Sequence, residues 1–158
     1  MLRKKYSVLV SRRFETFVEM EVDNGRETTR VHLAYDTRFR LQDPLDSDLK
    51  VQLNDFEDLS ADKLLAFYPR TEPRDAVDIF YILSRKVLKE IATAAHQKDP
   101  GFDLYWLAVA LEKTRTFPDE IEKWPVEMLV KMDVREVKKR FLDLACQIMN
   151  EIKAKNLQ

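Results

Sequence analysis

The residues best suited to chemistry flank a turn between two expected helices, where cations and carboxylates alternate. Lys63 lies near the expected start of the first helix, where the positive end of the helix dipole would add to its attraction for a phosphate group. Arg70 and Arg74 fall on the turn itself. Asp75 and Asp78 are three residues apart, so they share one face of the second helix. Cations in this arrangement are suited to binding phosphate.

The same residues also fit a purely structural role. Acids are electrostatically favoured in the first turns of a helix, and arginines on the preceding turn commonly form ion pairs with them. Residue chemistry alone therefore leaves both interpretations open.

The scarcity of glycine excludes several nucleotide-binding loops from this chain. Only Gly25 and Gly101 occur in its 158 residues, whereas Walker loops, dinucleotide-binding fingerprints and Gly-Gly or Gly-Ser turns need glycines close together. Cys146 is the only cysteine. It excludes a disulfide framework and a thiolate zinc cluster, and we expect it to be a small buried core residue. The 27 basic and 28 acidic residues cancel, so any nucleic-acid-binding surface must be local.

The elements that position these residues change from strands to helices along the chain. Alternating apolar residues predict strands over 6–10, 14–22 and 28–35, and Asn24-Gly25 favours a primed turn of a hairpin between the last two. A short strand is expected at 50–53. We predict an α+β fold, in which a partial nucleotidyltransferase-type mixed or antiparallel sheet precedes a helical carboxy-terminal half. Residues 1–57 form the strand-rich part, and residues 58–158 form the helical part of the same domain.

Helical periodicity predicts five helices after Asp58. Asp58 or Ser60 is expected to cap the first, Pro69 to end it, and Pro73 to open the second. The others are expected over residues 85–95, 103–113 and 134–152. Tyr105 and Trp106 lie in an apolar helix, which favours a core position over base stacking.

The polar cluster resembles the second half of a known enzyme family. Lys63, Arg70, the Arg74-Asp75 pair and Asp78 follow one another in the order and spacing of the AbiEii/AbiGii toxin family of nucleotidyltransferases, which has the fold of DNA polymerase β. The segment 29–36 is similar to the central strand of that family. The resemblance covers roughly residues 12–83.

The resemblance implies transfer of a nucleoside monophosphate from a nucleoside triphosphate to an acceptor hydroxyl, on tRNA for some family members, and an antitoxin protein as partner. It assigns nucleotide binding to Lys63, Arg70 and Arg74, and catalytic or positioning roles to Asp75 and Asp78. Mg²⁺ is the implied cofactor of a catalytically complete site.

The chain departs from the family pattern where metal ligands are needed. Family members carry an Asp-x-Asp strand after a glycine-containing turn, and this sequence has neither in that context. Asp46-Ser47-Asp48 lies in a proline-containing loop, and His32 occupies the position of the third acid, where a neutral imidazole is a poor magnesium ligand. We therefore expect no metal site and no catalysis from this chain alone. It is expected to be a truncated or degenerate nucleotidyltransferase, or a carboxy-terminal piece of a longer enzyme.

Two other functions remain open. The chain could be a non-catalytic module that binds a nucleotide, an RNA or a protein, or a subunit whose site is completed by a second polypeptide. An uncovered edge strand could also support homo-oligomers. No apolar stretch is long enough for a signal or a membrane span, which predicts a cytoplasmic protein without a membrane partner.

Overall fold

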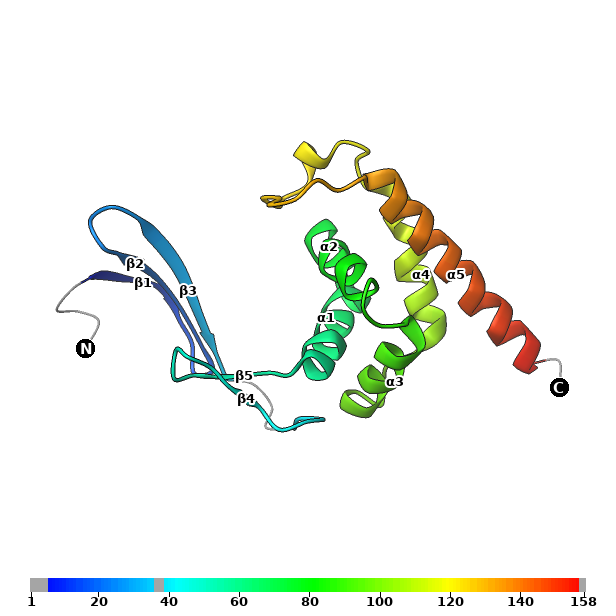
Figure 1. The fold of residues 1–158 in the computed structure, drawn as a ribbon, viewed down its shortest axis with the longest axis horizontal. Coiled ribbons are helices and arrows are strands. Elements are labelled where there is room, and N and C mark those ends of the chain that lie inside the picture. The colour runs from blue at the N-terminus through cyan, green and yellow to red at the C-terminus, as the bar shows by residue number, and fades with distance from the viewer. Residues whose placement is uncertain (1–5, 36–38, 157–158) are drawn as a thin grey trace. The chain divides into compact units, whose positions relative to one another are not determined.

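The computed structural model describes residues 6–35 and 39–156. The chain divides into two compact units, Met1–Phe39 and Arg40–Gln158, and each is described by itself. The first holds a sheet and the second holds the helices, so the α+β prediction is confirmed (Figure 1). The expected division at residue 57 within one domain stays a prediction.

The first unit contains a three-stranded antiparallel sheet. Strands β1 (Ser7–Arg13), β2 (Phe17–Asp23) and β3 (Thr28–Ala34) lie in the order β1-β2-β3, with Met20 opposite both Val10 and Val31. The apolar residues of β2 therefore share one face with those of its neighbours.

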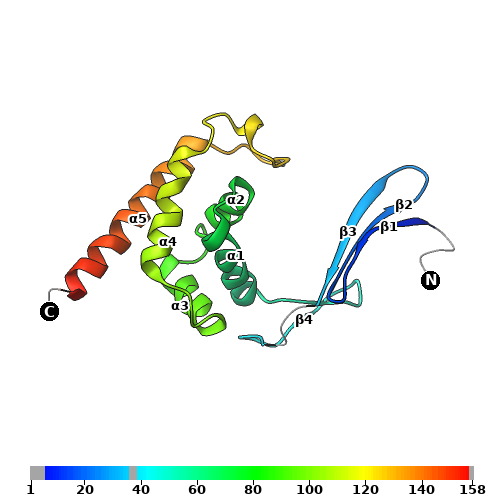
Figure 2. The same cartoon turned by 180° about the vertical axis from the view of Figure 1, so that it is seen from behind.

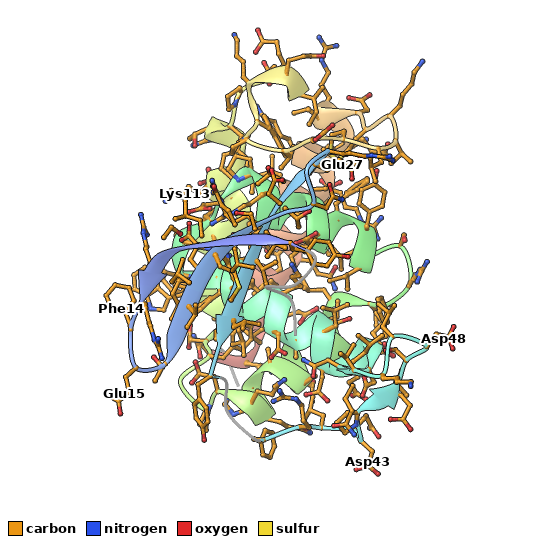
Figure 3. All side chains as sticks on the ribbon, turned by 90° about the vertical axis from the view of Figure 1, so that its left-hand side faces the viewer. Phe14, Glu15, Glu27, Asp43, Asp48 and Lys113 are labelled. Carbon is orange, nitrogen blue, oxygen red and sulfur yellow. The ribbon has the colours of Figure 1, made fainter. Side chains whose placement is uncertain are left out.

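The hairpin between β2 and β3 is confirmed, but its turn is not a primed Asn-Gly turn. Gly25 has a positive φ of 85°, whereas Asn24 does not. The Asn24 side chain instead accepts hydrogen bonds from the backbone N–H groups of Arg26 and Glu27. An Asx-type interaction thus stabilises the loop where a second left-handed residue was expected. Figure 3 shows Glu27 at this end of the sheet and Phe14 and Glu15 at the other.

The two edges of the sheet differ. β1 has a bulge between Val10 and Arg12, whereas β3 pairs with β2 over its full length without interruption. Bulges hinder pairing with a further strand. In the described part of the chain β3 is an edge strand, unlike the central strand that segment 29–36 resembles; Asp36 of that segment lies outside the described residues.

The second unit begins with a small hairpin. Strands β4 (Leu45–Asp46) and β5 (Gln52–Leu53) pair antiparallel, so the strand expected near residues 50–53 is present. Asp46 and Asp48 are exposed on this hairpin, and Figure 3 labels Asp48 on its outer side. The Asp-x-Asp sequence is therefore solvated, as expected.

Helix α1 (Phe56–Arg70) begins earlier and ends later than the sequence predicts. Its cap is Asp55, whose side chain accepts hydrogen bonds from the N–H groups of Glu57 and Asp58. Pro69 lies inside its last turn, because Thr71 closes the helix in a left-handed conformation and donates its N–H to the Phe67 carbonyl. Because proline has no N–H, the Leu65 carbonyl loses its helical hydrogen bond, and the helix ends one residue after Pro69.

Replacing Asp55 with alanine is expected to lower the free energy of unfolding by about 1 kcal/mol, because two N–H groups of the first turn lose their acceptor. The Oδ2 atom of Asp55 is buried with no hydrogen-bond partner among the described residues, and its removal offsets part of the loss. Urea unfolding followed by the helical circular dichroism signal measures the change. The exposed Asp43→Ala variant is the control; equal stability of both variants would contradict the role of the cap.

In the described part of the second unit, four further α-helices follow: α2 (Pro73–Ile82), α3 (Leu88–Lys98), α4 (Leu104–Lys113) and α5 (Val134–Asn156). Two short 3-10 helices, η2 (Thr114–Thr116) and η3 (Ile121–Lys123), lie between α4 and α5. Pro73 opens α2 at its first position, as predicted. Helix α4 lies along α5 in both views, while α3 and α2 pack on α1 (Figures 1 and 2). No helix in the described residues has the length and apolar character needed to cross a bilayer.

The core lies inside the helical unit, around Phe67, Leu107 and Phe141. Three expected core residues lie at the surface instead: Trp106 is 58% exposed, Tyr105 is exposed, and Cys146 is exposed. Helix α4 is apolar on all sides, but only the face around Leu107 is covered by neighbouring helices. Periodicity identified the helix but could not identify which face is covered.

Candidate functional site

Helices α1 and α2 bring Lys63 and Asp78 together. The Lys63 Nζ donates to Asp78 Oδ2 at 2.7 Å, and their side chains are 39% and 42% exposed. Lys63 lies two turns inside α1 rather than at its start, because the helix begins at Phe56. The expected contribution of the helix dipole is therefore absent, since it is confined to the first turn. A half-exposed ion pair of this kind is weak, so another anion can readily replace Asp78 as the partner of Lys63.

Arg70 and Asp75 form a second, tighter pair. Arg70 Nε donates to Asp75 Oδ2 and Nη2 to Oδ1, both at 2.7 Å, in a bidentate arrangement. The side chain of Asp75 is only 4% exposed. The hydrogen bond to Asp75 raises the pKa of Arg70 above the ordinary value for arginine. The pair ties the last turn of α1 to the first turn of α2.

Arg74 does not join either pair. Its Nε lies 2.7 Å from Glu72 Oε2 in an ion pair, and both side chains are exposed. Thr71, buried and left-handed at φ 50°, sets the direction of the turn between Arg70 and Arg74. Four of the five expected site residues thus lie in two pairs between α1 and α2, and the fifth lies on the surface beside them.

A pocket of about 260 Å³ opens at the Lys63–Asp78 pair. Besides these two residues, its lining contains Tyr81 and Ser84 from α2 and the turn after it, and Phe56, Leu59, Ile82 and Arg85. The Arg85 guanidinium lies 5.6 Å from the centre of the Phe56 ring, a cation–π distance. Arg70, Arg74 and Asp75 do not line this pocket.

Four polar or aromatic residues of this pocket were not predicted from the sequence: Phe56, Tyr81, Ser84 and Arg85. Helical spacing could have found two of them, because Phe56 lies seven residues before Lys63 and Tyr81 three residues after Asp78. Ser84 and Arg85 follow the end of α2, and their position depends on the turn that leads to α3.

The carboxylates of the site do not fit a Mg²⁺ ion. Both oxygens of Asp75 accept hydrogen bonds from Arg70, and Asp78 accepts from Lys63. Across residues 6–35 and 39–156, no group of three His, Cys, Asp or Glu side chains is placed to hold a metal. His32 is exposed on β3 with its Nε2 atom 3.8 Å from Glu19 Oε2. The magnesium prediction, which was conditional on a complete set of acids, stays a prediction.

A buried ion cluster, absent from the sequence predictions, anchors α1. Lys98 Nζ lies 2.6 Å from Asp58 Oδ1 and 2.6 Å from Asp62 Oδ1, and Asp58 also accepts from the N–H groups of Leu41 and Gln42. Burial by itself raises the pKa of Asp58, but hydrogen bonds from Lys98, Gln42 and Leu41 outweigh it and hold the pKa below 3.8. The cluster fixes the segment before the small hairpin to α1 and α3.

Comparison with known proteins agrees with the resemblance of the polar cluster. The family described as "Nucleotidyl transferase AbiEii toxin, Type IV TA system" matches residues 11–143. No curated protein matches the chain. A solved structure, JHP933 from Helicobacter pylori, superposes with a TM-score of 0.51 at 14% sequence identity, over 95% of this chain and 66% of that one. The likeness to JHP933 shows a shared fold, and this chain spans about two thirds of that protein's length. With most of its residues matched by the family, the chain belongs to the AbiEii nucleotidyl transferase toxin family.

Proposed function

We propose that the chain binds a nucleoside triphosphate in the Lys63 pocket and contributes this half of a nucleotidyltransferase site. Family membership supports the reaction class. The observation that carries the proposal is the placement of Lys63 and Arg85 around one pocket of about 260 Å³. Two cations there can meet a polyphosphate, and Tyr81 and Phe56 add aromatic surface beside them.

In this proposal the two acids, Asp75 and Asp78, have positioning roles. Asp78 holds Lys63 beside the pocket, and a phosphate that binds there replaces Asp78 as the partner of the ammonium group, because the half-exposed pair is weak. Asp75 fixes Arg70 and with it the angle between α1 and α2. Arg74, outside the pocket, contacts nucleotide only at the rim.

In this proposal the metal-binding acids are supplied from outside the described residues. Nucleotidyl transfer needs divalent metal to offset the charge of the triphosphate, and the described residues hold no group of acids placed for it. Among the described residues, β3 pairs only with β2, so its other edge is suited to pairing with a strand of another polypeptide. Pairing of the same edge with a second copy of this chain would give the homo-oligomer that the edge strand predicts.

We propose the hydroxyl of a tRNA as acceptor, and an antitoxin as the protein that opposes the activity. The family match over residues 11–143 supports the antitoxin, because the family is described as part of a toxin–antitoxin system. The tRNA acceptor is proposed from the resemblance of the polar cluster alone.

Replacing Lys63 with alanine is expected to weaken nucleoside triphosphate binding about tenfold, the loss of about 1.4 kcal/mol from one charge-assisted contact. Titration of the purified chain with a fluorescent triphosphate measures the affinity. Lys113→Ala is the matched control, because Lys113 is exposed on α4 outside the pocket. Unchanged affinity in Lys63→Ala would remove the proposed site.

The Asp78→Asn variant separates a positioning acid from a metal ligand. If Asp78 only holds Lys63, its loss frees the ammonium group and leaves triphosphate affinity equal or higher. A metal ligand would instead show lower affinity that depends on added Mg²⁺. The second result would contradict the positioning role.

The second candidate function is a non-catalytic binding module. It is favoured by the neutralisation of both acids, Asp75 by Arg70 and Asp78 by Lys63. Incubation with labelled nucleoside triphosphates, Mg²⁺ and bulk tRNA distinguishes transfer from binding. Transfer by this chain alone excludes the binding module. If Lys63→Ala lowers affinity for an RNA oligonucleotide and not for the triphosphate, the module is the better description.

A further inference from the structure

A second and larger cavity lies on another part of the helical unit. A groove of about 1000 Å³ runs between α3 and α5, with the start of α4 at its base; we call it the α3–α5 groove. Figures 1 and 2 both show the carboxy-terminal part of α5 extending beyond α3. We propose that the α3–α5 groove is the docking site for an acidic amphipathic helix of a partner protein.

The floor of the groove is apolar and follows a helical repeat. Leu144, Ile148 and Ile152 of α5 lie four residues apart and form a continuous stripe. Leu88 of α3 and Phe102 before α4 complete the floor. From Leu144 to Lys155 the groove follows α5 for about 16 Å, or three helical turns.

The rim carries an excess of available positive charge. Lys86, Lys89 and Lys155 line the groove and form no ion pair with any other described residue. Arg140 is a fourth cation of the lining, and Asp103 and Glu151 are its two acids, so the lining side chains carry a net charge of +2. Asp103 caps α4, and Glu151 accepts from the Gln147 side chain at 3.0 Å. The groove therefore attracts an occupant that is apolar on one face and negatively charged on its flanks.

These features select a helix among the possible occupants. An apolar floor lined at helical spacing fits the apolar stripe of an amphipathic helix, which recognises such grooves through residues at i, i+3, i+4 and i+7. A nucleic acid would leave this floor without a partner, because it offers charge and stacked bases instead of an aliphatic face. The groove is three helical turns long, and its volume of about 1000 Å³ lies at the upper limit for small-molecule pockets.

The test uses synthetic helical peptides of about fourteen residues, with leucines at i, i+3, i+4 and i+7 and glutamates on the opposite face. A second peptide replaces the glutamates with lysines. Binding is measured by fluorescence anisotropy on the full chain and on two charge-reversed variants. Lys86→Glu, Lys89→Glu and Lys155→Glu are combined in the first, and Lys113→Glu, Lys139→Glu and Lys153→Glu, which lie outside the groove, in the second.

The acidic peptide is expected to bind at least about tenfold more tightly than the basic one. The groove variant is expected to lose about tenfold in affinity, and the control variant to keep it, although the two have the same net charge. Leu144→Glu, in the floor, is expected to abolish binding. Because the lysine reversals change exposed or half-buried rim residues, they give the answer even if Leu144→Glu fails to fold.

Three results would overturn the proposal. Equal affinity for both peptides would show that charge does not select the occupant. Displacement of the peptide by a medium-chain fatty acid of higher affinity would assign the groove to a small amphiphile. A dimer in light scattering that dissociates only in the groove variant would make a second copy of this chain the occupant.

Discussion

Replacing Asp58 with asparagine is expected to lower the free energy of unfolding by about 3–5 kcal/mol, the usual cost of breaking a buried ion pair. The side chains of Asp58 and Lys98 are 1% and 5% exposed. The variant leaves the Lys98 ammonium group buried, with Asp62 as its only remaining acid. It also weakens the acceptor for the N–H groups of Leu41 and Gln42. Urea unfolding followed by the helical circular dichroism signal measures the loss.

Two companion variants separate the buried charge from the loss of a single hydrogen bond. Asp62→Asn removes the second partner of Lys98, and because Asp62 is partly exposed, we expect a loss of about 1 kcal/mol. Combining Asp58→Asn with Lys98→Met removes both charges and is expected to recover part of the stability. If the double variant loses as much stability as Asp58→Asn and Lys98→Met lose together when measured separately, the two residues are not a coupled pair.

The same cluster predicts a window of pH stability. The pKa of Asp58 is lowered in the folded state, so its contribution is present above its unfolded pKa of about 3.8 and is lost as the pH falls through the lower folded value. Burial lowers the pKa of Lys98, but hydrogen bonds to Asp58 and Asp62 hold it above 10.5. Its contribution is therefore present below pH 10.5 and is lost as the pH rises through the higher folded value. In the Asp58→Asn variant the acidic loss should be smaller.

Replacing Arg70 with alanine is expected to cost about 2–4 kcal/mol, because it leaves the buried carboxylate of Asp75 without its two donors. The value lies below that of a fully buried pair, since the exposed part of Arg70 lets water reach the vacated position. Lysine at this position can offer only a point charge, so Arg70→Lys should give an intermediate loss. Chemical unfolding of the unsubstituted chain, Arg70→Lys and Arg70→Ala, measured in parallel, ranks their free energies of unfolding.

Arg74→Ala is the matched control for this prediction. Arg74 lies four residues away in an exposed pair with Glu72, and its loss is expected to change stability by about 0.5 kcal/mol or less. Equal effects of Arg70→Ala and Arg74→Ala would show that the bidentate pair does not hold α1 and α2 together. If it does, Arg70→Ala should also weaken triphosphate binding, because the angle between these helices places Lys63 beside Asp78.

The sequence by itself determined the elements whose signals are local. Alternating residues around Gly25 predicted the hairpin, and Pro73 marked the start of α2 because its fixed φ suits a first helical position. The order Lys63, Arg70, Arg74-Asp75, Asp78 was enough for the family, since it depends only on spacing along the chain. The lack of neighbouring glycines excluded phosphate-binding loops for the same reason.

Only the tertiary structure decided which of these residues meet and which surfaces are covered. The left-handed Thr71 turns Arg70 toward Asp75 and leaves Arg74 outside, a choice that spacing cannot predict. Asp58 and Lys98 are forty residues apart in sequence, so no local pattern connects them. Helical periodicity shows which residues share a face, but burial depends on the neighbouring helix. For that reason Trp106, in the most apolar helix, lies at the surface while the charged Lys98 is buried.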